Sequence, residues 1–255
     1  MNNSTHTIRH GVDFSGATSG GSGIRIATRR PGSPVHEIRR VDRARLRREI
    51  LAGLDANGGE RHLWLVDAPF GLPIASLEAC GIARDWRASA EWLACFEDPR
   101  EWRRAVRKVS RKEPKRWADR ASSTPMASMN LRVFKQTWTA VVEILLPLVA
   151  EGVRVEPLAG PSDSNVVVGE GCPASVLKRR GDSSRGYKGR TDANRERRRE
   201  IFERLVSEWG LEVGELVPER CIEDAGGDDL DALLLTLDPW QGPPPAEALV
   251  EGWVW

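Results

Sequence analysis

The chain has 255 residues, of which 40% are hydrophobic and 29% are charged, with a formal net charge of +1 at pH 7. This composition provides enough apolar material for a core and excludes a wholly disordered chain. No apolar run approaches the ~20 residues of a membrane span, which excludes a membrane-spanning protein. The N-terminus lacks the apolar segment of a secretory signal, and the four cysteines show neither metal-ligand spacing nor the density of a disulfide scaffold. A cytoplasmic location is therefore expected.

The first sixty residues predict an antiparallel meander followed by a helix. Strand patterns at 8–15, 24–28 and 35–41 are separated by turns rich in glycine and proline. Asp42 is a favourable N-cap for a helix of about four turns that stops at Asn57.

The rest of the chain predicts buried strands embedded in helices. Residues 62–66 and 165–169 are short continuous apolar runs, as is typical of buried parallel strands, and residues 153–155 indicate a minor strand. Residues 74–150 are otherwise helical, and their last helix uses apolar residues from Leu131 to Val149. A basic helix at 191–209 and a leucine-rich helix at 228–237, capped by Asp228 or Asp229, complete the predicted elements.

Carboxylates follow the predicted parallel strands. Asp13, Asp67 and Glu170 each stand at the end of one of them. Right-handed crossovers bring these strand ends to one edge of the sheet, where open α/β sheets place their sites. Asp228 and Asp231 lie three apart, on one face of the leucine-rich helix. Each residue alone has a structural explanation as a turn former or helix cap.

Together these carboxylates predict a metal site. Converging carboxylates repel one another unless a hard divalent cation balances their charge, and oxygen-only ligation suits Mg²⁺ or Mn²⁺. Two such ions about 4 Å apart activate a water and stabilise the leaving oxygen in phosphodiester hydrolysis. The candidate catalytic residues are Asp13, Asp67, Glu170 and Asp231, and Asp228 joins them as a candidate metal ligand.

Basic residues are concentrated in two segments. Residues 100–120 and 176–204 are rich in Lys and Arg, whereas residues 205–255 contain only Arg220 among many acids. Such runs are either solvated helix faces or a surface that faces phosphates. On the second interpretation the partner is nucleic acid, and the candidate contacts are Arg103, Arg104, Lys108, Lys112, Lys178 and Lys188.

An ordered set of short motifs extends over nearly the whole chain. They are GVDFSG at 11–16, VDAPFGLP at 66–73, EGCPA at 170–174, YKG at 187–189, LDA at 230–232 and EGWVW at 251–255. In these motifs the chain resembles the domain of unknown function 429 family, described as predicted nucleases with an RNase H-like fold. The resemblance implies one RNase H-like α/β domain over 1–255, with a mixed five-stranded sheet of order 3-2-1-4-5 flanked by helices. It also implies a helical insertion at about 74–150, between the fourth and fifth strands.

The resulting functional hypothesis is a metal-dependent nuclease or phosphodiesterase that uses two metal ions. Two alternatives remain. Residues 13–21 resemble the phosphate-gripping hairpin of the sugar kinase, actin and chaperone ATPase group, which favours a nucleotide-binding phosphotransferase or ATPase. The other alternative is a nucleic-acid-binding module whose carboxylates are purely structural.

Overall fold

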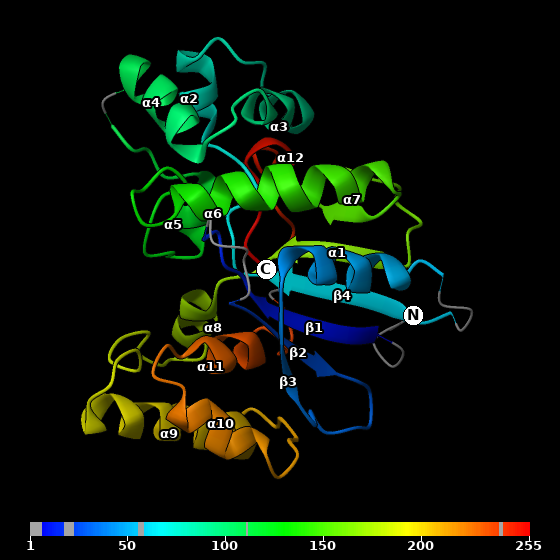
Figure 1. Ribbon diagram of the computed structural model, residues 1–255, viewed down its shortest axis with the longest axis vertical. Helices are drawn as coiled ribbons and strands as arrows, with labels where there is room; N and C mark the ends of the chain where they lie inside the picture. The colour runs from blue at the N-terminus through cyan, green and yellow to red at the C-terminus, as the bar shows by residue number, and fades with distance from the viewer. Residues whose placement is uncertain (1–6, 18–22, 56–58, 111, 240–241) are drawn as a thin grey trace.

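The computed structural model describes residues 7–17, 23–55, 59–110, 112–239 and 242–255. At its centre lies a mixed sheet of six strands with helices on both faces (Figure 1). The strand order is β3-β2-β1-β4-β6-β5. The strands are β1 (Thr7–Asp13), β2 (Ile24–Arg29), β3 (Ile38–Val41), β4 (Arg61–Val66), β5 (Arg154–Glu156) and β6 (Val166–Glu170).

The α/β class is confirmed, but the predicted five-strand order is wrong. Strands β1, β4, β6 and β5 are parallel neighbours, and β2 is antiparallel to both β1 and β3. The minor strand expected at 153–155 is β5, which joins the sheet outside β6 and forms its edge. It does so because Val155 is fully buried in the core while the β5 backbone pairs with residues 167–169 of β6.

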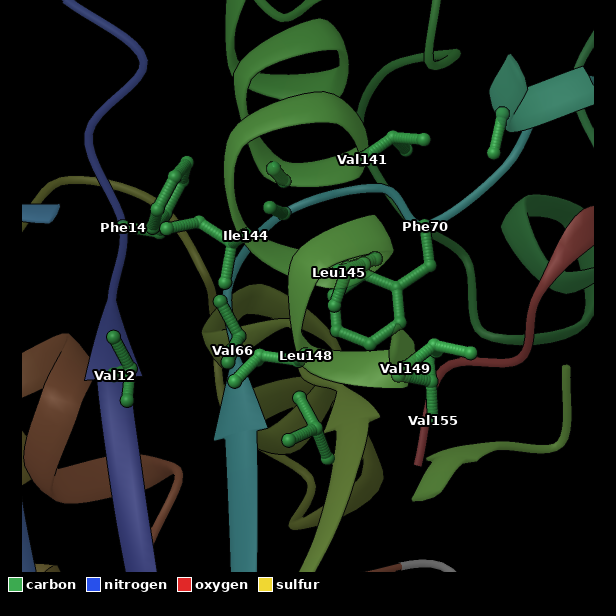
Figure 2. Packing of buried hydrophobic residues seen from close by; sticks show 14 of the residues in the cluster. Val12, Phe14, Val66, Phe70, Val141, Ile144, Leu145, Leu148, Val149 and Val155 are labelled. Carbon is green, nitrogen blue, oxygen red and sulfur yellow. The ribbon is translucent and has the colours of Figure 1, made fainter. Parts of the chain in front are cut away.

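One face of the sheet is covered by α1 (Arg43–Ala52) and by a continuous helical rod made of α6 (Phe134–Thr139), the π-helical turn η2 (Ala140–Leu145) and α7 (Leu146–Ala150). Figure 2 shows side chains of this rod, among them Ile144 and Leu148, packed against Val12 and Val66 of the sheet. Full burial of such a side chain contributes about 1.5–3 kcal/mol. The rod starts later than predicted, since Leu131 precedes it and is 68% exposed. Similarly, α1 ends at Ala52 and not at Asn57.

The opposite face is covered by α8 (Pro173–Arg179), α9 (Asp192–Ser207), α10 (Val217–Glu223) and α11 (Asp228–Leu234). Leu230, Leu233 and Leu234 are fully buried, and α11 packs against β1 and β2. The predicted cap of this helix is wrong. Its N-cap is Gly227, whose φ of 74° lies in the left-handed region that favours glycine, and Asp228 is already helical.

Along the chain, four further helices follow β4 and precede the rod. They are α2 (Ile74–Ala79), α3 (Trp86–Ala94), α4 (Pro99–Val109) and α5 (Trp117–Ala121). Near the C-terminus, α12 (Ala248–Glu251) precedes a tail in which Val254 forms a parallel bridge with Glu170. In Figure 1, α4 lies at the opposite end of the molecule from α9 and α10. Within the described segments, no helix has both the length and the hydropathy of a bilayer span.

Candidate metal centre

Three of the predicted ligands meet at the carboxyl edge of the sheet. Asp13 ends β1 and Asp67 directly follows β4; because Val12 pairs in register with Val66, the two aspartates reach this edge side by side. Asp231 comes from α11, which packs across β1. Carboxylate oxygens of these three residues all lie within 4.8 Å of one another.

The charge of this cluster is poorly compensated. Burial, followed by the charges of Asp231 and Asp67, raises the pKa of Asp13 well above its ordinary value. Burial and the charge of Asp231 raise the pKa of Asp67 to about 7. Burial also raises the pKa of Asp231. In all three aspartates the carboxylate is therefore harder to ionise than an exposed one.

Asp231 is the member of the cluster with direct partners. It is 1% exposed, accepts a hydrogen bond of 2.8 Å from the Tyr187 hydroxyl and pairs with the Lys188 ammonium at 2.5 Å. Burial acts to lower the pKa of Lys188, but Asp231 raises it overall, so this side chain is charged. Among the described residues, Lys188 is the one cation that forms an ion pair with any of the three aspartates.

The donor set fits a hard divalent cation. It offers only carboxylate oxygens, close enough to share one ion, and among the described residues Lys188 alone forms an ion pair with any of them. A divalent ion would offset the mutual repulsion of the three carboxylates.

Glu170 was predicted as a ligand and catalytic residue, but the structure gives it another partner. Its carboxylate accepts two hydrogen bonds from the buried guanidinium of Arg116, at 2.5 and 2.7 Å, and one from the backbone N–H of Phe70 at 2.9 Å. Asp119 pairs with the same guanidinium at 2.7 Å. Burial acts to lower the pKa of Arg116, but the two carboxylates raise it overall, so the ion pair is maintained.

The pleat of the sheet explains this outcome. Glu170 lies in register with Val66, and side chains in register on parallel strands point to the same face. Val66 faces the helical rod, so Glu170 does too, whereas Asp67 is one residue further and points the other way. The position of Glu170 at the end of a parallel strand predicted the correct edge of the sheet. It could not predict the face of the sheet to which the side chain points.

Asp228 lies outside the cluster. It is the first residue of α11, and its carboxylate is not among those within 4.8 Å of one another. Its charge nevertheless contributes to the raised pKa of Asp13. At this position Asp228 adds negative charge near the three aspartates but is not placed to bind the same ion directly.

A pocket of about 460 Å³ opens beside the three aspartates. Asp67 and Asp231 lie in its wall together with Arg116, Glu170 and Asp119. The remaining lining comes mainly from three segments, at 124–136, 171–174 and 184–188.

The predicted basic residues are dispersed. Lys188 lines the pocket, whereas Arg103, Arg104, Lys108, Lys112 and Lys178 do not. Arg103 is bound to the Met129 carbonyl oxygen at 3.0 Å and to Glu113 at 2.7 Å. Arg104 and Lys108 are exposed on α4, and Lys112 is exposed just beyond it.

Sequence reasoning missed two cations of the pocket. Arg132 lies in the wall, isolated in sequence from both basic runs. Arg116 belongs to the first basic run, where nothing distinguished it from its solvated neighbours. The resemblance did include Tyr187, but only as part of a motif, without a role.

Comparison of the chain with models of known protein families, with curated proteins and with solved structures finds no match. The glycine-rich part of the predicted phosphate hairpin, at 18–21, falls outside the described residues.

Proposed function

We propose that this chain is a metal-dependent phosphodiesterase that hydrolyses nucleic-acid phosphodiester bonds with Mg²⁺ or Mn²⁺. The observation that carries the proposal is the convergence of Asp13, Asp67 and Asp231, with oxygens within 4.8 Å, at the edge of a pocket. The part of the sheet ordered β3-β2-β1-β4-β6, with β2 alone antiparallel, agrees with an RNase H-like core.

Each residue has a role that follows from its position. Asp13, Asp67 and Asp231 would hold the metal, and two bound ions would supply an activated water and stabilisation of the leaving oxygen. The Tyr187 hydroxyl orients Asp231 by donating to its carboxylate. Lys188, half-exposed beside Asp231, places a positive charge where a phosphate of the substrate would lie.

The experiment is a cleavage assay with end-labelled single-stranded, duplex and junction substrates in Mn²⁺ or Mg²⁺, alongside an ATP hydrolysis control. We expect metal-dependent cleavage that falls by more than about a hundredfold in Asp13→Asn, because even outer-shell changes at metal sites cost 10–100-fold. Asp163→Asn is the matched control, since Asp163 is exposed and its substitution removes one charge away from the cluster.

Three results would contradict the proposal. Cleavage that is equal in wild type and Asp13→Asn would mean that the cluster does not act in hydrolysis. Binding of nucleic acid without turnover would favour a binding module. Metal-dependent ATP hydrolysis without cleavage of nucleic acid would favour the phosphotransferase alternative.

A further inference from the structure

The hydrogen-bond ladder between β1 and β4 ends where the aspartates begin. Its last bond among the described residues runs from the Asp67 N–H to the Val12 carbonyl oxygen at 2.9 Å. Beyond that bond, no backbone N–H of the described residues donates to the carbonyl oxygen of Phe14 or to that of Asp67. Both oxygens accept instead from one side chain, the amide of Gln136 on α6.

The Gln136 amide joins the ends of the two strands. Its nitrogen donates to the Phe14 carbonyl oxygen at 2.8 Å and also to the Asp67 carbonyl oxygen. An amide nitrogen carries two hydrogens, so these two bonds use both of its donors. Because both partners are acceptors, they also fix which end of the amide faces the strands. Gln136 itself lines the pocket beside the aspartates.

The backbone of α6 lies against the same segment of the chain. A Cβ atom on Gly16 would lie 2.4 Å from the Gln136 Cα, so the segment after β1 can approach the helix this closely only at a glycine. The Phe14 side chain is buried in the same core cluster as Ile144 of the rod (Figure 2). Contacts that do not involve the amide therefore also hold Gln136 at the end of β1.

We infer, on the basis of the proposed function, that Gln136 is a positioning residue of the metal centre, which sets the separation of the Asp13 and Asp67 carboxylates. A bond to the Asp67 carbonyl oxygen restricts the backbone torsion next to the side chain that would bind the metal. The bond to the Phe14 carbonyl oxygen restricts the backbone directly after Asp13. Two carboxylates that repel each other move apart more easily when these restraints are lost.

The test measures Mn²⁺ affinity by calorimetry, at a temperature at which the proteins compared are folded, and the thermal midpoint in a chelator. Gln136→Met keeps the length of the side chain and removes both donors. We expect this variant to bind Mn²⁺ about 10–100-fold more weakly than the wild type, as is found when groups that orient metal ligands are changed.

Trp138→Phe is the matched control. The Trp138 indole N–H donates to the Leu93 carbonyl oxygen at 3.0 Å, so this variant also removes a side-chain donor of α6 from a backbone carbonyl, but at α3 and not at the ends of β1 and β4. We expect a lower thermal midpoint and the Mn²⁺ affinity of the wild type. The same result in Gln136→Met would show a merely structural role and would overturn the inference.

Gln136→Asn provides a second measurement, which decides the matter if Gln136→Met does not fold. It keeps both donors, but it is shorter by one methylene group and cannot reach both carbonyl oxygens from the same backbone position. We expect its Mn²⁺ affinity to fall as well, and an affinity equal to that of the wild type would overturn the inference.

The proposed function fails separately from this inference. Mn²⁺ binding that is lost in Asp13→Asn but unchanged in the Gln136 variants would leave the metal centre standing without a role for the amide. If the wild type binds no Mn²⁺, the proposed function fails, and the inference that rests on it fails too.

Discussion

Arg116 divides the carboxylates at this edge of the sheet into two groups. Glu170 and Asp119 both form ion pairs with its buried guanidinium, and the Glu170 pair holds the segment before α5 against β6. Asp13 and Asp67 have no such partner among the described residues, so their repulsion remains. Asp67 and Glu170, which both stand at strand ends in the sequence, thus differ in whether a buried cation pairs with the carboxylate.

The raised pKa of Asp67, caused first by burial and then by the charge of Asp231, predicts how the metal-free protein responds to pH. The pKa of Asp67 rises from its ordinary value of 3.8 to about 7 on folding, so its contribution to stability is fully present below pH 3.8 and is lost as the pH rises towards 7. One pKa unit corresponds to about 1.4 kcal/mol, so the loss amounts to a few kcal/mol. In urea denaturation with a chelator, Asp67→Asn should therefore be more stable than the wild type at pH 8, and the difference should shrink at pH 5. A difference that does not change with pH would contradict the prediction.

Lys188 is expected to compete with the metal for Asp231. Replacement by Met removes the ammonium at 2.5 Å and leaves the aspartates more negative, so Lys188→Met should bind Mn²⁺ about tenfold more tightly, a change of about 1.4 kcal/mol. Its hydrolysis of a phosphodiester should nevertheless fall, because a cation beside the phosphate is lost. Calorimetry and the cleavage assay measure the two effects separately. Lys112→Met is the control, since Lys112 is exposed just beyond α4 and does not line the pocket. Unchanged affinity in Lys188→Met would show that the ion pair does not oppose the metal.

At the scale of elements, the position of Asp231 depends on how closely α11 approaches β1. A Cβ atom on Gly11 would lie 2.0 Å from the Ala232 carbonyl oxygen, so the helix can take this position only over a glycine. Val12 and Asp13 follow Gly11 directly on β1, and Asp231 is the neighbour of Ala232 on α11. The close approach of Gly11 to Ala232 therefore sets the distance between Asp13 and Asp231.

Gly11→Ala should accordingly impair the metal site without touching a carboxylate. The added methyl group must push α11 away from β1, and overpacking of this kind costs about 1–3 kcal/mol. We expect a lower thermal midpoint and a much smaller rise of that midpoint on addition of Mn²⁺. Gly23→Ala is the control, because its nearest contact would be an ordinary 3.6 Å from Ser15. A Gly11→Ala protein with the full Mn²⁺ response would show that the approach of α11 does not set the site.

The elements that carry the acidic residues at this edge of the sheet could be predicted from the sequence, because continuous apolar runs and a leucine-rich helix have strong patterns. Residues 62–66 and 165–169 became β4 and β6, extended or shifted by about one residue. The third strand was predicted from residue 35 but spans Ile38–Val41, because Val35 instead forms a bridge with Val213. That contact joins parts of the chain far apart in sequence and has no local pattern. The face of Glu170 and the partner of Arg116 depend on such long-range contacts too.

At the scale of the whole molecule, the two basic segments of the sequence do not form one continuous basic surface. The two basic segments lie in different layers, and α4 lies at the opposite end of the molecule from α9. Many of their arginines pair with acids nearby, as Arg195 does with Glu223 and Arg199 with Glu196. Among the acids of the last fifty residues, Asp231 belongs to the aspartate cluster, and others form ion pairs, as Asp229 does with Arg220 and Asp238 with Arg9. A count by segment could not reveal the part of this cancellation that comes from long-range pairs such as Arg195 with Glu223.

This arrangement predicts a shallow salt dependence for nucleic-acid binding. Each phosphate neutralised on a single strand contributes about −0.7 to the slope of log affinity against log salt concentration. If Arg132 and Lys188 are the cations that meet phosphates, the slope for a short single-stranded oligonucleotide in Mn²⁺ should be about −1.4. Joint replacement of Arg104, Lys108 and Lys112 by Ala should leave that slope unchanged, because these exposed side chains do not line the pocket. Fluorescence titrations at several salt concentrations measure both slopes. A slope steeper than about −3 in the wild type that flattens in the triple variant would instead make α4 part of the binding surface, with a strand long enough to cross from the pocket to that helix.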